Sequence, residues 1–429
     1  MDQAMTFPRY EFYKNSDTDW LGDIPSDWLL GTIRAVTQLK SEKNQPELQV
    51  LSVYREYGVI PKNSRDDNHN ATSLDTSGYK VVNKGDLVVN KMKAWQGSMG
   101  ISEHDGIVSP AYITCRVDAE RVYPKFLHYL LRSQPYIGVY NDLSYGVRVG
   151  QWDMHYEDFK RIPLPLPDRT CQERIANFLD QKTAEIDEAI AKKQRLIDLL
   201  KEQKAILINQ AVTKGLNPDV PLRDSGVEWI GEVPANWNIK VNRELFVERK
   251  DSGSESLPIL SVSLHTGVSD SEQDETENIR SKVRIEDKTA YRRVYPGDIA
   301  FNMMRAWQGA IGVVKTNGQV SPAYVIATPC CLIDGEYFEY QYRTSSFIGQ
   351  MDRFSKGITD FRKRLYWDEF KRLFTIVPPI DEQKKIIMKI REIAISTDQV
   401  VEKIDREIEH IREFRSILIS TAVTGKIKI

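Results

Sequence analysis

Two clusters of cationic and amide side chains surround a repeated AWQG string. The first cluster holds Lys91, Lys93 and Gln96, and the second holds Arg305 and Gln308. Arg, Lys and Gln can hydrogen-bond to base edges in a DNA groove, and the cations also bind phosphates. These residues are therefore the candidates for DNA contact in a chain that reads DNA. Further candidates of the same kind lie in a glycine-flanked stretch and in a basic run, namely Arg148, Gln151, Arg362, Lys363 and Arg364.

Some of these residues have an alternative role in the framework of the fold. Trp95 and Trp307 follow strand-like runs in both copies of the string, and tryptophan is usually well buried. We therefore favour a framework role over DNA contact for both rings. Lys91 aligns with Met303, which weakens the case for a contact common to both copies. The basic run 362–364 fits a solvated face equally well, since most charge runs lie on surfaces. Weaker candidates for base contacts are Ser64, Arg65, Arg280, Lys282 and Arg284.

The sequence lacks the motifs of two enzyme classes that act on DNA, the adenine methyltransferases and the nucleases. A methyltransferase of adenine needs a glycine-rich cofactor turn and an Asn/Asp-Pro-Pro-aromatic motif, and VPPID at 377–381 has only the prolines. A nuclease needs clustered carboxylates with a lysine, and the Pro-Asp pair at 167–168 lacks the downstream Glu-x-Lys. The four cysteines show no CxxC spacing, which argues against zinc and against a disulfide framework. We expect no catalytic residue, no metal site and no cofactor in this chain.

Composition bounds the class of protein but leaves its partner open. The chain has 429 residues, of which 41% are hydrophobic, and this length favours two large domains. The net charge of −2 neither requires nor excludes nucleic acid. The N-terminal region is polar, and no apolar run is long enough to cross a membrane, so we expect neither a signal peptide nor a membrane span. The natural compartment is the reducing cytoplasm.

The AWQG string belongs to a repeat that covers nearly the whole chain. Asp86 aligns with Asp298 at an offset of 298 − 86 = 212. A period of this length is the size of a domain plus a connecting element, so the chain is a tandem duplication. The other matching pairs are WLGDIPSDW (20–28) with WIGEVPANW (229–237), VSPAY (108–112) with VSPAY (320–324), and EDFKR (157–161) with DEFKR (368–372).

Each repeat begins with short strand-like runs and an amphipathic helix. LQVLSVY (48–54), DLVVN (86–90) and AYITCRV (111–117) alternate with Gly, Asn and Asp turns. The stretch 124–140 begins at a proline and has apolar residues at helical spacing, and 335–351 is its counterpart. Each repeat therefore predicts an α+β domain with a mixed or antiparallel sheet.

A long helix follows each of these domains. Prolines hold residues 163–167 extended, and Thr170 with Glu173 forms a capping box. Neither Pro nor Gly interrupts 172–213 or 383–424, and apolar residues recur about every 3.5 residues, as in a coiled coil. The predicted seam residues are Ile175, Leu179, Ile186, Ala189, Leu196, Leu200 and Leu207 in the first helix, and Ile386, Ile390, Ile393, Val400, Ile404, Ile411 and Leu418 in the second.

The two apolar stripes are expected to bury each other. A helix of ~63 Å cannot stand alone in water, and the stripes match in period and length. The duplication imposes a pseudo-two-fold axis, which requires antiparallel helices with one domain at each end. Packing of each helix on its own domain is the less favoured alternative, because the seam is narrow. We therefore predict an α+β fold with two globular domains, 1–167 and 216–379, separated by an antiparallel intramolecular coiled coil of 168–215 and 380–429.

The ordered motifs resemble those of the specificity (S) subunits of type I restriction-modification systems. They are WLGDIPSDW, GDLVVNKMKAWQGSMG, GIVSPAY, and EDFKRIPLPLP followed by QERIANFLD, each with a second copy. The resemblance runs from Trp20 to the C-terminus. It implies two target recognition domains and two conserved helical regions. It also implies a non-catalytic subunit that reads a bipartite, asymmetric DNA sequence.

The resemblance further implies the partners. They are double-stranded DNA, two methyltransferase subunits and, in the larger complex, two restriction and translocase subunits. S-adenosylmethionine, ATP and Mg²⁺ would belong to those partner subunits. Residues 38–80 and 247–290 have little in common, so we expect the domains to read different half-sites, which the helices hold at a fixed separation. The alternative is a coiled-coil scaffold without DNA affinity, which salt-dependent DNA binding by the complex would exclude.

Overall fold

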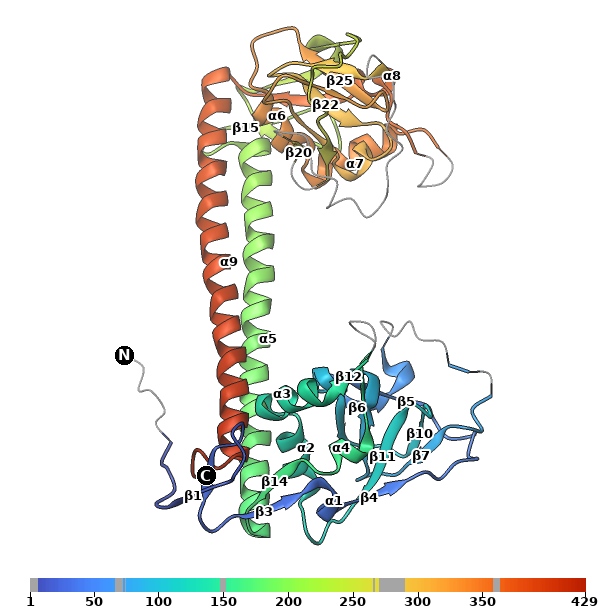
Figure 1. Cartoon of the computed structure of the whole chain (residues 1–429). Helices are drawn as coiled ribbons and strands as arrows, with labels where there is room; N and C mark the ends of the chain where they lie inside the picture. Colours follow the sequence, from blue (N-terminus) through green and yellow to red (C-terminus); the bar gives the residue numbers. More distant parts are fainter. Residues whose placement is uncertain are drawn as a thin grey trace. The chain divides into compact units, whose positions relative to one another are not determined.

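A computed structural model gives the fold of the chain (Figure 1) and describes residues 7–65, 72–73, 75–146, 152–264, 267–269, 290–357 and 363–429. The chain divides into two compact units. Unit 1 consists of residues 1–194 and 405–429, and unit 2 consists of residues 195–404. The long helices are α5 (Arg169–Lys214) and α9 (Ile380–Val423). Each helix is divided between the two units. The part of a unit outside these helices is its head.

The head of unit 1 is built on a four-stranded antiparallel sheet in the order β4-β11-β8-β9. Its strands are β4 (Thr37–Lys40), β11 (Tyr112–Val117), β8 (Leu87–Asn90) and β9 (Met99–Ile101). Helices α2 (Pro124–Leu131) and α3 (Gln134–Leu143) bury their apolar faces in the same core. The other elements are α1 (Ile33–Val36), η1 (Lys62–Ser64), η2 (Lys91–Gln96), α4 (Tyr156–Phe159), and the strand pairs β1 (Tyr13–Asn15) with β2 (Asp23–Pro25), β3 (Leu29–Thr32) with β14 (Pro163–Leu166), β5 (Leu51–Tyr54) with β6 (Gly58–Pro61), β7 (Lys80–Val82) with β10 (Gly106–Val108), and β12 (Ser144–Tyr145) with β13 (Asp153–Met154).

The head of unit 2 repeats this plan. Its four-stranded sheet has the order β18-β25-β22-β23, with β18 (Phe246–Glu248), β25 (Tyr324–Pro329), β22 (Ile299–Asn302) and β23 (Ile311–Val313). Tyr324 stands opposite Asn302 just as Tyr112 stands opposite Asn90, so the strand register is the same. The other elements are α6 (Gly335–Tyr342), α7 (Ser345–Phe354), α8 (Trp367–Phe370), η3 (Asn242–Glu244), η6 (Ala306–Gln308), and the pairs β15 (Leu222–Asp224) with β16 (Glu232–Pro234), β17 (Asn238–Val241) with β26 (Phe374–Val377), β19 (Val262–Ser263) with β20 (Gly267–Val268), and β21 (Arg292–Val294) with β24 (Gly318–Val320).

The α+β class and the antiparallel sheets confirm the predicted fold of the heads. Strands β5, β8 and β11 lie within the three predicted runs. The helix predicted over 124–140 is instead two helices, which break at Arg132 and Ser133. The Ser133 hydroxyl donates to the Leu130 carbonyl at 2.8 Å, and Thr344 does the same to Gln341 in unit 2. A hydroxyl that satisfies a carbonyl at a helix end competes with continuation of the helix.

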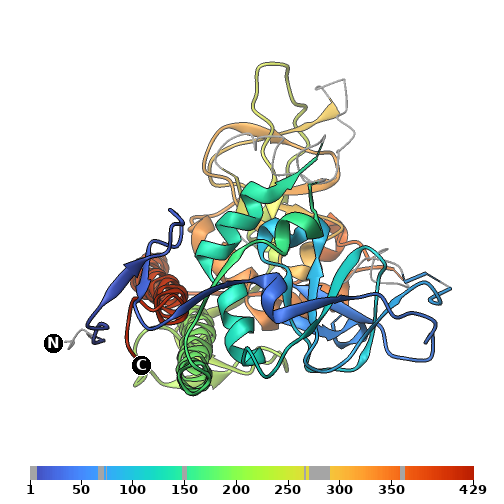
Figure 2. The same ribbon diagram turned by 60° about the horizontal axis from the view of Figure 1, so that its bottom comes forward.

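Within each unit, α5 and α9 run antiparallel side by side (Figures 1 and 2). In unit 1, Asp187 pairs with Arg415 at 3.3 Å and Lys193 pairs with Glu407 at 2.6 Å, so the numbering rises along α5 as it falls along α9. In unit 2, Lys204 pairs with Asp398 at 2.8 Å. Apolar residues such as Ile408 in unit 1 and Ile197 and Ile404 in unit 2 are buried. The predicted antiparallel pairing of the helices is therefore confirmed within each unit.

The predicted seam was wrong at several positions. Leu196, Leu207 and Val400 are 46%, 37% and 44% exposed, whereas the neighbouring Ile197 is buried. Apolar residues stand in adjacent pairs at these sites, and a period alone does not decide which member of a pair faces the partner helix. The predicted cap at Thr170 was also wrong. The carboxylate of Asp168 accepts from the Cys171 N–H at 2.9 Å, and α5 already begins at Arg169.

The two ends of the chain meet in unit 1. The Tyr13 hydroxyl donates to the Gly425 carbonyl at 3.1 Å, and the Lys428 N–H donates to the Pro8 carbonyl at 2.8 Å. In unit 2, the chain passes without interruption from α5 into β15. In unit 1, the C-terminal segment after α9 contacts the N-terminal segment without a covalent link, whereas in unit 2 the chain joins α5 to β15 directly. None of the described helices combines the length and the apolar character that a membrane span requires.

Candidate nucleic-acid interface

The AWQG string forms a tight turn after the same strand in each head. Strand β8 ends at Asn90, η2 follows, and Gly97 closes the turn in the left-handed region at φ 81°. Gly309 closes the corresponding turn at φ 96°. A Cβ atom on Gly97 would stand 2.9 Å from the Cδ1 atom of Ile137 on α3, so the turn packs closely on that helix. The turn therefore has a fixed side, against α3 or α7, and an exposed side.

The exposed side of each turn carries several of the predicted contact residues. Lys93 is exposed and Gln96 is half-buried in the first head. Arg305 and Gln308 are both exposed in the second head. These side chains leave the turn with donors available to a partner.

A short ribbon runs beside the turn in each head. In unit 1 it is β12 with β13, and in unit 2 it is a bridge between Lys356 and Arg364. The two ribbons are related by the repeat, because 364 − 153 = 211 places Arg364 where unit 1 has Asp153. The predicted contacts Arg148, Gln151 and Arg362, and the weaker candidates Arg280, Lys282 and Arg284, lie outside the described residues. We call the turn and its ribbon the turn–ribbon surface of a head.

The tryptophan of each turn packs against the ribbon. Trp95 makes an edge contact with Trp152, with ring centroids 5.5 Å apart. Lys363 takes the place of Trp152 in the second head, and its ammonium lies 5.0 Å from the centroid of the Trp307 ring. The Trp307 indole N–H donates to the Met304 carbonyl at 2.9 Å. Both rings are half-buried, and this packing supports the framework role for the tryptophans.

The two surfaces differ in charge. Lys91 pairs with Asp153 at 2.8 Å, with side chains 36% and 31% exposed, so solvent screens the pair and it contributes at most about 1 kcal/mol. Met303 and Arg364 stand at these two positions in the second head. Arg364 donates to the Lys363 carbonyl at 2.9 Å, and Lys363 pairs with Asp352 at 2.7 Å. The first surface therefore holds a neutral ion pair where the second carries arginine and an apolar side chain.

Sequence reasoning missed the exposed large side chains on these surfaces. Met92 and Met304 lie exposed in the turns, Tyr145 lies exposed in β12 of the ribbon, and Tyr366 lies exposed at the start of α8. Tyr145 stacks on His155 at 5.0 Å with an interplanar angle of 17°. The ribbon pairs segments that show no marked strand periodicity. The sequence alone therefore did not indicate the position of Tyr145 on this surface.

A cavity that Gly97 helps to line contains two basic side chains with lowered pKa values, His128 and Arg132. Burial lowers the pKa of His128 to about 3, and the positive charge of Arg132 contributes. Burial lowers the pKa of Arg132 to about 10, with a contribution from the charge of Arg415. Near the turn itself, burial lowers the pKa of Lys80, and the charges of Lys43 and Lys91 add to the effect.

Comparison with known proteins identifies the family. Residues 25–197 match the model of the type I restriction modification DNA specificity domain. The type I restriction enzyme EcoKI specificity subunit of Escherichia coli K12 is 20% identical over 438 residues, which cover 95% of this chain and 90% of that protein. The chain therefore carries the type I DNA specificity domain and is similar to a type I specificity subunit over nearly its whole length. The EcoBI specificity subunit of Escherichia coli is 23% identical over 62% of this chain and 58% of its own length.

Two solved structures show the same fold as this chain. One chain, from work on complex assembly and conformational transition of the type I R-M system, aligns with a TM-score of 0.64 at 13% identity. The alignment covers 94% of this chain and 99% of that chain. The HsdS subunit of Thermoanaerobacter tengcongensis aligns with a TM-score of 0.52 at 14% identity, over 94% of this chain and 98% of its own. The matches do not favour the methyltransferase alternative.

Proposed function

We propose that this specificity subunit reads a bipartite, asymmetric DNA sequence, with one half-site at the turn–ribbon surface of each head. The family model and the specificity-subunit relatives support the role in DNA recognition. The observation that carries the assignment is the contrast between the heads. Their strand registers are the same, yet the surface positions Lys91, Asp153 and Trp152 become Met303, Arg364 and Lys363. A conserved frame with exchanged polar groups is what two different half-sites require.

The exposed groups fit direct reading of bases. Arg and Lys favour the O6 and N7 acceptors of guanine, and Gln favours the donor and acceptor pair of adenine. Lys93 and Gln96 serve the first head, and Arg305 and Gln308 serve the second. Each good bidentate pair gives ~1–3 kcal/mol of discrimination, so one such contact per head already separates cognate from altered half-sites.

The chemistry of the complete system would lie in other subunits. Type I specificity subunits assemble with further restriction-modification subunits and DNA, and we propose two methyltransferase and two restriction and translocase subunits for this one. The chain would be non-catalytic and act in the cytoplasm. S-adenosylmethionine, ATP and Mg²⁺ would bind to those partners. The absence of methyltransferase and nuclease motifs from the sequence supports this division of labour.

Two double variants test the proposal. Lys93→Ala with Gln96→Ala should relax one half-site, and Arg305→Ala with Gln308→Ala should relax the other. Lys192→Ala, at an exposed lysine of α5 outside both heads, is the control and should leave both half-sites unchanged. The readout is sequencing of methylated adenines after reaction of each reconstituted complex with a randomised DNA library. A double variant that alters both half-sites equally, or neither, would contradict the assignment of one half-site to each head.

A further inference from the structure

A cavity of ≈ 770 Å³ lies in unit 1, between α2, the β5–β6 hairpin and the unit 1 pieces of α5 and α9. Its lining includes Gly97, at the end of the AWQG turn, and Tyr57, at the tip of the hairpin. Five of the lining side chains are Lys or Arg and three are acidic, so the lining carries a net charge of 5 − 3 = +2 with neutral histidines. The charged residues are Arg55, Lys125, Arg132, Arg412, Arg415, Glu56, Glu103 and Asp180.

Arg132 stands out among these cations because it is half-buried, whereas Arg55 is exposed and the other three pair with carboxylates. Lys125 pairs with Asp180 at 2.7 Å, Arg412 with Glu409 at 2.7 Å, and Arg415 with Asp187 at 3.3 Å. Arg132 donates through Nη2 to the carbonyls of Arg55 and Glu56 at 2.6 and 2.8 Å, and its Nη1 lies 2.8 Å from Nε2 of His128. Within the described part of the chain, no carboxylate forms an ion pair with it. A partly buried cation without a counter-charge is unfavourable, and a bound anion removes that cost.

The second head contains the same arrangement with its own carboxylate. Arg343 corresponds to Arg132 (343 − 132 = 211), and Glu339 corresponds to His128. Glu339 accepts from the Val313 N–H at 2.9 Å, as His128 accepts from the Ile101 N–H at 3.2 Å. Arg343 pairs with Glu339 at 3.1 Å and donates to the Leu264 carbonyl at 2.8 Å. In each head the corresponding arginine thus holds a hairpin. At the position of His128, however, the second head has a carboxylate, Glu339.

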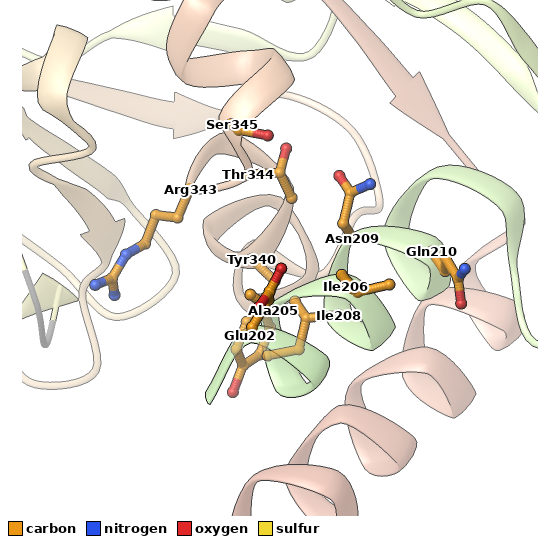
Figure 3. A pocket seen from close by; sticks show the side chains of 10 residues that line it. All are labelled: Glu202, Ala205, Ile206, Ile208, Asn209, Gln210, Tyr340, Arg343, Thr344 and Ser345. Carbon is orange, nitrogen blue, oxygen red and sulfur yellow. The ribbon is translucent and has the colours of Figure 1, made fainter. Parts of the chain in front are cut away.

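The corresponding cavity of unit 2 lacks the cationic character of the first. It has a volume of ≈ 570 Å³, and Arg343 is the one Lys or Arg among the described residues that line it. Figure 3 shows the Arg343 side chain extending away from Ile206 and Asn209, which line the other side. A positive lining is therefore a property of the first head and does not follow from the shared fold.

We propose that the cavity lined by Arg132 binds a phosphate group, and that this group is a backbone phosphodiester of the DNA that the first head reads. The proposal rests on the proposed function. A tetrahedral oxyanion suits a guanidinium surrounded by further cations. DNA is favoured as its source because the lining includes Gly97 of the AWQG turn and residues 55–57 and 59–60 of the β5–β6 hairpin, both parts of the recognition head. Free phosphate has the same chemistry and is separated from DNA by experiment.

The decisive variant gives the first head the acid of the second. His128→Glu should pair with Arg132, keep the hairpin in place and neutralise the cavity, and Glu339 shows that the fold accepts a glutamate there. His128→Gln is the matched control, because it keeps a hydrogen-bond acceptor without adding charge. The complex with its methyltransferase subunits is titrated with DNA of the mapped sequence at several salt concentrations. We expect His128→Glu to weaken binding about tenfold and to lower the salt slope by ~0.9, the value for one phosphate, while His128→Gln binds as the unchanged protein does.

Two results would overturn this assignment. Equal weakening by Glu and Gln would show a structural effect, and normal affinity and slope for His128→Glu would show that the cavity meets no phosphodiester. A third arm adds inorganic phosphate to the complex without DNA and follows its melting temperature. Stabilisation that His128→Glu abolishes, with unchanged DNA binding, would assign the cavity to free phosphate instead of DNA. Preference of the unchanged complex for its mapped sequence over random DNA is measured in parallel, since its loss would refute the proposed function itself.

Discussion

Replacing Gly97 with alanine tests whether the AWQG turn positions the recognition surface. Gly97 has φ 81° and donates its N–H to the Ala94 carbonyl at 2.7 Å. An added Cβ would lie 2.9 Å from Cδ1 of Ile137, closer than real Cβ contacts come. The variant must therefore hold an unfavourable backbone conformation and also move a side chain of α3.

The expected cost follows from these two effects. A left-handed backbone costs an L-residue roughly 1–2 kcal/mol. Moving the Ile137 terminal methyl off its rotamer adds about 0.5–1.5 kcal/mol. We expect a loss of about 2 kcal/mol in the stability of unit 1, or roughly 4–8 °C in its melting temperature for a unit of this size. The turn shifts relative to α3, so the half-site read by the first head should lose discrimination.

Calorimetric melting and methylation mapping measure the two consequences together. Gly138→Ala is the control, because this glycine of α3 has open space around it and alanine favours a helix. It should raise stability by up to about 1 kcal/mol and leave recognition intact. Gly309→Ala should affect the opposite half-site, since Gly309 has φ 96° and an added Cβ would stand 3.1 Å from Cδ1 of Ile348. Unchanged melting of Gly97→Ala, or loss of both half-sites together, would refute the reasoning.

Four further outcomes are expected. His128 has a folded pKa near 3, below its unfolded value, so unit 1 should lose stability as pH falls from about 6.5 toward 3, by up to ~1.4 kcal/mol per pH unit; melting against pH should show a flatter profile for His128→Gln. Asn242→Ala removes the acceptor of the buried Tyr342 and Thr375 hydroxyls and should destabilise unit 2 by about 3 kcal/mol in urea titrations, whereas a loss below 1 kcal/mol would contradict the network. Seven residues inserted between Asp187 and Lys193 shift α5 by ~10 Å and should disrupt unit 1, and a second insertion between Glu407 and Arg415 should restore it, as judged by proteolysis. A chain with its ends joined by a flexible linker and new ends at 217–219 should still fold, because Tyr13 already contacts Gly425; an insoluble product would count against this.

The sequence predicted most of the frame because the frame depends on local signals. The repeat, the strand runs around β8 and β11, and the uninterrupted apolar period of α5 and α9 are all legible within short windows. The direction of the helix pair also followed, since the duplication leaves only one symmetric arrangement. Adjacent apolar pairs such as Leu196 and Ile197 were not resolved, because their orientation depends on the partner helix.

The candidate sites were predicted only in part, for a related reason. Lys93, Gln96, Arg305 and Gln308 lie in the repeated string and were found there. The arrangement around Arg132 joins α2 to a hairpin more than seventy residues earlier in the chain, at 76 and 77 positions' separation, and no local pattern reveals such a contact. The difference between the heads became visible only in the structure, where Arg343 pairs with Glu339 and Arg132 lies beside His128.

The meeting of the chain ends in unit 1 has a consequence for synthesis on the ribosome. Domains usually complete themselves in the order in which they are made. Here Leu418, Ala422 and Val423 belong to the apolar core of the head that is translated first. Unit 2 is one continuous stretch and is finished earlier, while the head of unit 1 keeps an open core until residues 418–423 emerge. A chain that stops before residue 418 therefore lacks part of the core of the head that was made first.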